Sequence, residues 1–497
     1  MKNNIKLLGL GLAGMLALSS CSDQFLDDKK NYDNVSNDIY NYYSGADGRV
    51  QDIYAWCLPD DGSISWKIPS TGLPDICSKA TEEYAGFGSF NDPLTELSST
   101  SSTNGVPDFF MNANANIQEA VYGRIRNIND VIRGINGGSL SEAEKNELLG
   151  QVYFFRGWCY YNLMKWYGGV PLVKEVLDPL EGSFTPRSSA KETYEFIIND
   201  LQTAADMLME RTGNGGWEGS NWGRVTAGTA LALKGRVMLL WASPLFNRAN
   251  DESRWEAAYE AMKTDLPLIE ACGYGLYTDT SNPNGKDFAS MFLQAGANPE
   301  AVFVTLYNNK EGDGLDTQKN NGWERNIRPS NTGGQGQAAS ANIVDLFPMK
   351  DGKMPALQID LMQTYNYKNT YKKLEKSEIP YDADAPFLNR DPRFYWTFAM
   401  PGFRWAYSGD ASMKDPNNPA DGKNYTLWNY VWYTESDSQG NPASGDSFGA
   451  DNLMNSKRGV YVRKKSDDFD VNSAAMYTYA ATATYDCAPY YSGAPLI

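Results

Sequence analysis

The stretch Ser141–Pro171, SEAEKNELLGQVYFFRGWCYYNLMKWYGGVP, decides the fold class of this chain. It begins with the capping box Ser141-Glu142-Ala143-Glu144, in which serine and glutamate satisfy each other's free backbone N–H groups. Apolar residues then recur at helical spacing. They are Leu148, Val152, Phe155, Cys159 and Leu163. Gly168-Gly169 and Pro171 end the pattern, so we predict one long helix that buries an apolar face against other helices.

Similar helical periods occur on both sides of this stretch. The expected helices are residues 117–135, 191–210, 226–245 and 252–270. Small residues, among them Ala227, Gly228, Ala232 and Gly235, stand where helices could pack closely. Five helices in succession suggest stacked helical hairpins of the tetratricopeptide (TPR) kind, although a strict period of about 34 residues is not visible.

From about Asn282 onward the composition shifts to Gly, Asn, Asp, Ser and aromatic residues. Short strands are predicted at Ala301–Leu306 and Gly459–Val462, with long loops between them. Long loops in compact proteins are more often functional than idle. The fold class is therefore mainly α, a TPR-like superhelix with an irregular, loop-rich subdomain that contains short strands.

The first residues have the pattern of an export signal. Lys2 and Lys6 precede the apolar run Leu7–Leu18, which is too short to span a bilayer as a permanent helix. The end of the run, Leu18-Ser19-Ser20-Cys21, resembles the lipobox of bacterial lipoproteins, in which the cysteine becomes the acylated first residue. We expect residues 1–20 to be removed and Cys21 to anchor the mature protein to a membrane.

Composition excludes several classes of function. The formal net charge of −17 disfavours nucleic acid as a partner, because that binding needs cationic groups. Histidine is absent, which removes imidazole-based triads, the usual general base near neutral pH and nearly all zinc catalysis. Beyond Cys21, an odd number of widely spaced cysteines argues against a disulfide scaffold. Only Cys57 and Cys77 are close enough in sequence to suggest a bridge.

Several motifs, in order along the chain, resemble those of the SusD/RagB family. They are Tyr122, Ile125 and Asn129; Phe154–Leu163 with Trp166–Leu172; Gly223–Thr226 with Ala230, Leu231 and Lys234; Asp345, Phe347 and Asp351-Gly352; and Arg390–Phe394. Each motif is weak alone, but the ordered set is specific and, with the lipobox, covers essentially the whole chain.

The resemblance implies a surface-exposed outer-membrane lipoprotein of Bacteroidetes that captures glycans and acts as a lid on a SusC-like, TonB-dependent transporter. It divides the chain into a signal peptide (1–20), a helical TPR-like region (21–280) and a loop-rich region (281–497). Family chains usually continue after a segment like Ala494–Ile497 into a further helix. We therefore expect helices beyond Ile497 in the full protein.

A sugar ring presents a face of C–H groups and a rim of hydroxyls, so its receptor needs aromatic surfaces and polar side chains at their edges. Two regions offer both, and in relatives ligand contacts tend to come from these two regions. The first contains Trp66, Asp75, Tyr84 and Phe87, and the second contains Asn321, Trp323 and Arg325, with Tyr307 upstream. Such a site needs no catalytic group and no cofactor.

Two alternatives remain open on the sequence. One is a peptide-binding receptor of the RagB kind. The other is a carboxylate-based glycoside hydrolase, for which the adjacent acids Asp60-Asp61 or Glu82-Glu83 could be proposed. Asp313 and Asp316 lie in Gly-rich sequence that could hold calcium, but the EF-hand spacing is absent, so no metal is predicted.

Overall fold

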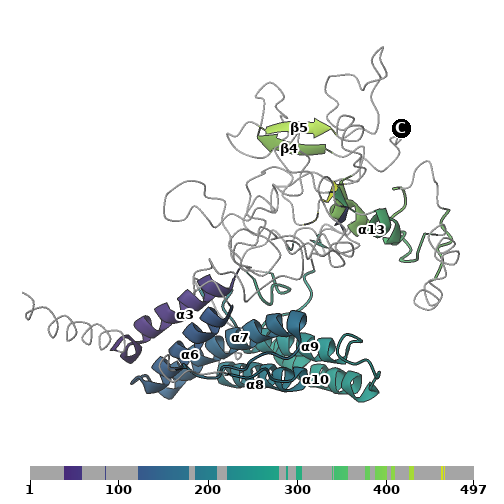
Figure 1. Cartoon of the computed structure of the whole chain (residues 1–497). Helices are drawn as coiled ribbons and strands as arrows, with labels where there is room; N and C mark the ends of the chain where they lie inside the picture. Colours follow the sequence, from purple (N-terminus) through teal and green to yellow (C-terminus); the bar gives the residue numbers. More distant parts are fainter. Residues whose placement is uncertain are drawn as a thin grey trace, which may run out of the picture. The chain divides into compact units, whose positions relative to one another are not determined.

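In the computed structural model the predicted long helix is α7, Glu142–Tyr167 (Figure 1). Its capping box is present: the Ser141 hydroxyl oxygen accepts from the Glu144 N–H at 3.4 Å, and the Ser141 N–H donates to the Glu144 carboxylate at 2.9 Å. At the other end Gly168 has a φ of 68°, which glycine adopts without strain, and its N–H donates to the Met164 carbonyl. Both predicted boundaries of this helix are confirmed.

The structure describes the chain in separate stretches. They are residues 38–58, 84–85, 121–177, 185–209, 221–278, 287–288, 291, 298–304, 338–339, 341–355, 375–380, 387–399, 404–408, 425–429, 461–462 and 464. These stretches divide between two units. The first unit contains the long helices, and the second contains the strands and two short helices.

Each of the other helices predicted in the first unit is present (Figure 1). Their bounds are α6, Val121–Gly137; α8, Ala190–Leu208; α9, Ala227–Ala242; and α10, Glu252–Ala271. Residues 117–120 of the first prediction lie outside the described stretches. Ser189 with Glu192 and Thr226 with Thr229 form further capping boxes, which start α8 and α9. Successive helices from α6 to α9 pack on one another in chain order.

The apolar stripe of α7 is the core of the helical unit. Its five predicted members are no more than 1% exposed. Gly157 lies where α7 meets α8, and a Cβ there would come within 3.0 Å of the Leu201 side chain. Gly235 of α9 faces Met262 of α10 in the same way, so this small residue allows close helix packing as predicted.

Two N-terminal elements were not predicted from the polar start of the chain. They are the 3₁₀ helix η1, Ile39–Asn41, and α3, Tyr43–Cys57. Tyr54 of α3 donates to the Gln151 side chain of α7 at 2.8 Å and accepts from the Val225 N–H at 2.7 Å. These contacts between distant parts of the chain fasten α3 to the helical unit.

The second unit is built on two small antiparallel sheets. One has the strand order β1-β2-β6-β3, with bounds Tyr84–Ala85, Ala338–Ala339, Tyr461–Val462 and Phe398–Ala399. The other pairs β4, Arg404–Ser408, with β5, Tyr425–Asn429. The short helices are α13, Ala341–Leu346, and α15, Pro392–Thr397. Strand β6 confirms the strand predicted within Gly459–Val462.

The strand predicted at Ala301–Leu306 is wrong for its described part, residues 301–304, which form no strand. Asn298 explains the difference. Its side-chain oxygen accepts from the Glu300 N–H at 2.9 Å, and its carbonyl accepts from the Ala301 N–H at 3.1 Å. An asparagine that bonds its own backbone two residues on stabilises a turn, and this local bonding replaces the strand.

The described stretches contain neither a membrane-spanning helix nor a disulfide. None of the helices described there is long and apolar enough to cross a bilayer. Cys57, Cys159 and Cys272 are buried free thiols, so Cys57 is not bridged to Cys77, which itself lies outside the described residues.

Ser141→Ala is expected to lower the free energy of unfolding by about 1 kcal/mol, because the cap of α7 is lost. The hydrogen bonds from the Ser141 hydroxyl and backbone lower the pKa of Glu144. A lowered carboxyl pKa stabilises the fold above the unfolded-state value and less as the pH falls through the folded-state value. Denaturant unfolding of wild type and variant at pH 7 and pH 3 measures the loss of the cap and the smaller contribution of Glu144 at the lower pH. Ser139→Ala, an exposed serine whose N–H donates to Asn41, is the matched control, and equal destabilisation by the two variants would contradict the cap.

Candidate functional site

The ligand residues predicted from the sequence fall mostly outside the described stretches. Outside are Trp66, Asp75, Phe87, Tyr307, Asn321, Trp323 and Arg325, and also Cys21, Asp60-Asp61, Glu82-Glu83, Asp313 and Asp316. Tyr84 is described as backbone only, in β1, where it pairs with Ala339 of β2. The structure therefore tests none of the predicted ligand contacts.

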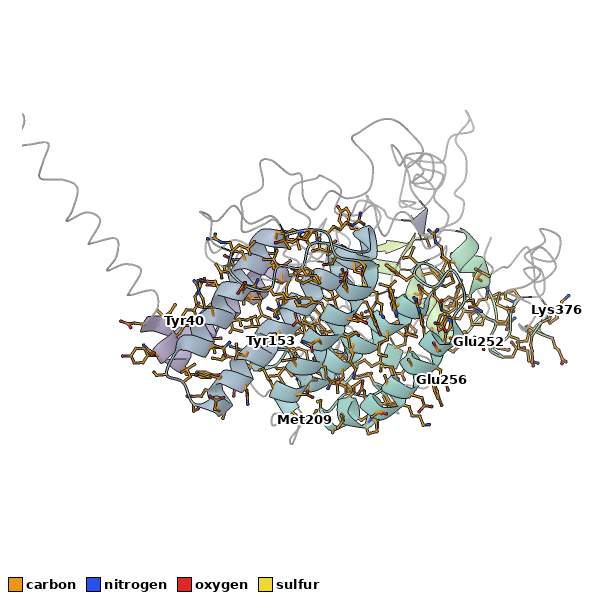
Figure 2. The ribbon with its side chains drawn as sticks, turned by 60° about the horizontal axis from the view of Figure 1, so that its bottom comes forward. Tyr40, Tyr153, Met209, Glu252, Glu256 and Lys376 are labelled. Carbon is orange, nitrogen blue, oxygen red and sulfur yellow. The ribbon has the colours of Figure 1, made fainter. Side chains whose placement is uncertain are left out.

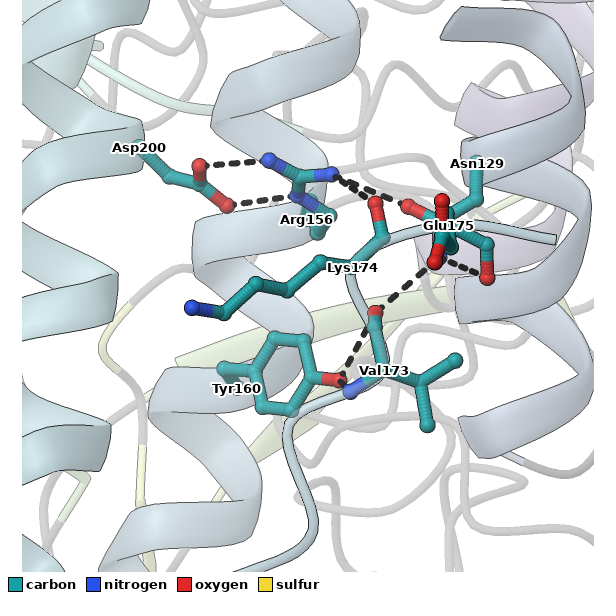
Figure 3. Close-up of polar contacts among 7 residues, drawn as sticks. All are labelled: Asn129, Arg156, Tyr160, Val173, Lys174, Glu175 and Asp200. Atoms are coloured by element: carbon teal, nitrogen blue, oxygen red, sulfur yellow. Dashed lines mark hydrogen bonds and ion pairs between the residues drawn. The ribbon is translucent and has the colours of Figure 1, made fainter. Parts of the chain in front are cut away.

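Instead, the described residues reveal what the SusD/RagB-like signature on α7 does. Arg156 lies in the middle of that helix and is 7% exposed. Its Nε and Nη2 atoms donate to the two carboxylate oxygens of Asp200 on α8, at 2.7 and 2.8 Å (Figure 3). This two-pronged pairing is the strongest geometry that an arginine forms with a carboxylate. It joins α7 to α8 at a fully buried position.

The remaining donors of Arg156 reach α6 and the chain beyond α7. Nη1 donates to the Asn129 side-chain oxygen of α6 at 3.0 Å and to the Lys174 carbonyl at 3.2 Å. Asn129 in turn donates to the carbonyls of Val173 and Glu175, at 3.0 and 3.3 Å (Figure 3). One buried cation thus connects three helices and the extended stretch 170–175, which we call the strap.

Two tyrosines complete the attachment of the strap. The Tyr160 hydroxyl donates to the Val173 carbonyl at 3.2 Å and accepts from the Val173 N–H at 2.7 Å. The Tyr122 hydroxyl of α6 donates to the Pro171 carbonyl at 2.9 Å. Burial raises the pKa of both phenols far above their usual range, so both remain protonated donors.

The electrostatics of the cluster also fit a support and not a reactive centre. Burial lowers the pKa of Arg156, but the hydrogen bonds and charge of Asp200 outweigh burial and leave that pKa raised. The Phe196 ring lies 5.1 Å from the guanidinium carbon of Arg156 and 5.6 Å from the Lys174 ammonium, within the range of cation–π attraction. We conclude that the cluster holds the strap.

A second buried cation ties the outer helices together. The Lys234 ammonium of α9 lies 2.7 Å from the Asp265 carboxylate of α10 and donates to the Gln202 side chain of α8 at 2.8 Å. Lys234 and Asp265 are each less than 10% exposed. The pattern of the Arg156 cluster, one cation shared by three helices, is repeated here.

The later motif Arg390–Phe394 also has a structural role. Arg390 is 2% exposed and donates to the Phe347 and Val344 carbonyls at the end of α13. Its guanidinium lies 5.0 Å from the Phe394 ring. Asp391 caps α15 by accepting from the Arg393 N–H at 2.9 Å. The motif thus connects the end of α13 to the start of α15.

Sequence reasoning missed Asp200 and Asp265, the two acids that are buried among the described residues. A signal for the first was present: Asp200 interrupts an apolar stripe that includes Ile197 and Leu201, and an acid in such a position needs a buried partner. The partner cannot be identified from sequence, because 44 residues separate Arg156 from Asp200. Among the described residues, no group of three or more acidic or cysteine side chains is arranged to hold a metal ion.

Comparison with known proteins extends beyond the described stretches. Residues 84–239 match a SusD-like family model described as "starch-binding associating with outer membrane", and residues 299–485 match the model of the SusD family. A SusD-like protein of Bacteroides ovatus is 24% identical over 239 residues, which are 47% of this chain and 39% of that protein. The matched part therefore spans about two fifths of that relative's length.

Two solved structures from Bacteroides fragilis NCTC 9343 share the fold. A SusD-like protein is 20% identical, with a TM-score of 0.55 over 88% of this chain and 71% of the other. A SusD-like carbohydrate-binding protein is 18% identical, with the same TM-score and the same shares covered. At these identities the likeness establishes the fold alone.

The two family matches come in the same order along the chain as the motifs noted in the sequence. The first covers the α7 signature that holds the strap, and the second covers the Arg390–Phe394 motif that connects α13 with α15. The description of the first model concerns binding to starch, which agrees with the expectation of a binding protein. The chain belongs to the SusD/RagB family.

Proposed function

We propose that this protein is a cell-surface, glycan-binding lipoprotein that captures oligosaccharide and delivers it to a partner TonB-dependent outer-membrane transporter of the SusC kind. The observation that carries the proposal is the pair of family matches over residues 84–239 and 299–485, one of which is described as starch-binding and associated with the outer membrane. The solved carbohydrate-binding relative from Bacteroides fragilis has the same fold, which adds support.

The proposed architecture is a TPR-like superhelix, residues 21–280, that supports a loop-rich ligand-binding region, residues 281–497. The stacking of α6 to α9 in chain order supports the first part. The boundary is supported by the change from one unit to the other at residues 269–270. Residues 1–20 are the proposed signal peptide.

The lipid anchor is proposed at Cys21, on the lipobox-like sequence Leu18-Ser19-Ser20-Cys21. We expect Cys21→Ala to move the protein from the membrane fraction to the soluble fraction, because several acyl chains are lost and each buried methylene contributes about 0.8 kcal/mol. Cell fractionation measures the shift, and mass spectrometry of the N-terminal peptide detects the lipid. Equal membrane retention of the variant, with no lipid mass on the wild-type peptide, would contradict the anchor.

The proposed ligand site is an aromatic platform from two regions of the sequence. It is formed by Trp323, Arg325, Asn321 and Tyr307, with Trp66, Asp75, Tyr84 and Phe87. Trp323 follows Asn320-Asn321-Gly322, which favours a turn and exposure of the ring. Arg325 is close enough in sequence to bond the hydroxyl rim of a sugar stacked on that ring.

Trp323→Ala is expected to weaken oligosaccharide binding about tenfold or more, because burying a large apolar side chain contributes about 1–3 kcal/mol. A glycan array first identifies the oligosaccharide, and calorimetry then measures its affinity for wild type and variant. Tyr42→Ala, which removes a ring that is 69% exposed on the helical unit, is the matched control and should leave the affinity unchanged.

Three outcomes would change the proposal. Unchanged affinity of Trp323→Ala, or lost binding with a large drop in melting temperature, would show that this ring is structural. Binding to a peptide array and not to the glycan array would favour a peptide receptor. The oligosaccharide should be recovered intact after incubation, and shortened products would contradict a binding protein.

A further inference from the structure

Exposed apolar side chains of the described residues are concentrated in and near α10 along the chain. Among the described residues, eight large apolar side chains are strongly exposed. They are Tyr42, Leu239, Leu245, Trp255, Tyr259, Leu266, Leu268 and Leu276. Seven of the eight lie between residues 239 and 276, from the end of α9 to just beyond α10. Where such residues share one surface, they mark an interaction site more often than scattered exposure does.

Three of these side chains form a stripe along α10. Trp255, Tyr259 and Leu266 are 41, 63 and 50% exposed, and the half-buried Met262 lies between the last two. Spacings of four and seven residues place these three on one side of the helix, while Met262 packs against Gly235 of α9. This is the spacing by which one helix packs along another. We call Trp255, Tyr259 and Leu266 the α10 stripe.

The inner side of α10 is already occupied. Ala258, Asp265 and Ile269 are its buried residues, and Asp265 pairs with Lys234 of α9. In stacked helical arrays the outermost helix normally presents a polar face to water, because an apolar outer face would stick to other molecules. The α10 stripe runs along the edge of this inner side and departs from that rule, as expected for a surface on which another helix packs.

The charges beside the stripe indicate what kind of helix fits. The exposed charged side chains of α10 are four glutamates, Glu252, Glu256, Glu260 and Glu270, and one lysine, Lys263. Figure 2 labels Glu252 and Glu256 on this helix. Lys263 lies 3.4 Å from Glu260, so its charge is partly compensated within α10. The surface is therefore apolar along its centre and acidic beside it.

We propose that the α10 stripe binds an amphipathic helix of a different polypeptide, with an apolar stripe flanked by lysine or arginine. Electrostatic complementarity selects this partner, since basic flanks would meet the glutamates of α10. A second copy of this chain is disfavoured because its acidic flanks would face the same acidic flanks. This inference goes beyond glycan capture and does not depend on the proposed ligand site.

The test uses the full chain and three labelled synthetic peptides of equal length. The first has a leucine stripe at spacings of three and four with lysine flanks. The second has the same stripe with glutamate flanks, and the third is a scrambled form of the first without a stripe. Fluorescence anisotropy at 50 and 150 mM salt measures binding, with both concentrations chosen because salt screens exposed charges. We expect the first peptide to bind at least about tenfold more tightly than the other two.

Leu266→Ser and Leu268→Ser form the matched pair of variants. Both replace an exposed leucine of α10, on either side of Pro267, but residues two apart do not share a helix face. Leu266→Ser is expected to weaken binding of the first peptide about tenfold, because a buried leucine contact is lost. Leu268→Ser should bind like the wild type, and circular dichroism checks that both variants fold.

Each of the remaining outcomes would overturn the proposal. Equal binding of the lysine-flanked and scrambled peptides would indicate general attraction to an acidic protein. Equal effects of Leu266→Ser and Leu268→Ser would show that the stripe is not the contact. A dimer of the wild-type chain in light scattering, lost in Leu266→Ser, would identify a second copy as the occupant. Absence of binding by all three peptides would mean that the stripe accepts no such helix.

Discussion

Asp200→Ala is expected to lower the free energy of unfolding by about 3–5 kcal/mol, the range for removing one partner of a buried ion pair. The substitution leaves the Arg156 guanidinium buried, without the two hydrogen bonds that Asp200 accepts. Among the described residues, Nη1 donates to the Asn129 side chain and the Lys174 carbonyl, which are neutral and cannot balance the charge. Denaturant unfolding followed by helical circular dichroism measures the loss.

Two further variants separate two contributions to this loss. One is the cost of leaving a buried charge without a partner, and the other is the stability that the ion pair itself contributes. Arg156→Met combined with Asp200→Leu removes both charges, and we expect it to be more stable than Asp200→Ala because no unpaired ion remains. Lys191→Met breaks an exposed pair with Glu195 at 3.6 Å and should cost less than about 1 kcal/mol. A loss below about 1 kcal/mol for Asp200→Ala would contradict a supporting role for the cluster.

Phe394→Ala is expected to destabilise the second unit by about 3–5 kcal/mol, the usual range for truncating a buried phenylalanine. Phe394 is fully buried, with ring centres of Phe347 at 5.6 Å and Phe398 at 5.2 Å. Its ring also lies against the guanidinium of Arg390, so the variant loses a cation–π contact as well as packing.

Thermal unfolding followed by tyrosine and tryptophan fluorescence measures this loss. Arg393→Ala is the matched control on the same short helix. Its side chain is 53% exposed and pairs with Asp391, so its removal should cost less than about 1 kcal/mol. If Phe394→Ala and Arg393→Ala melted at the same temperature, the packing of Phe394 against Phe347 and Phe398 would not support the second unit.

Local signals predicted most of the helical unit. The bounds of α7 agree with the capping box and with Gly168, and α8, α9 and α10 agree with their predicted ranges to within three residues. Apolar spacing and caps involve residues only three or four apart, so they can be read without the fold. The same reasoning failed at residues 301–304, where one asparagine side chain stabilises a turn.

Elements that depend on distant contacts were missed. Helix α3 has weak amphipathicity and contains Gly45 and Gly48, and its main anchors are Tyr54 to Gln151 and to Val225. Those partners are 97 and 171 residues away. The ligand residues around Trp323 stay predictions, because they lie outside the described stretches.

By itself, the sequence determined the family, the helical class of the first unit and the order of its helices, because these rest on motifs and on apolar periods within single segments. Only the tertiary structure decided that Arg156 pairs with Asp200 and holds the strap, and that Lys234 pairs with Asp265. Asp200 and Asp265 were two of sixty-one acidic residues in the sequence. A charge can be buried only where a partner and hydrogen bonds compensate its lost hydration, and which acid provides them depends on how the helices pack.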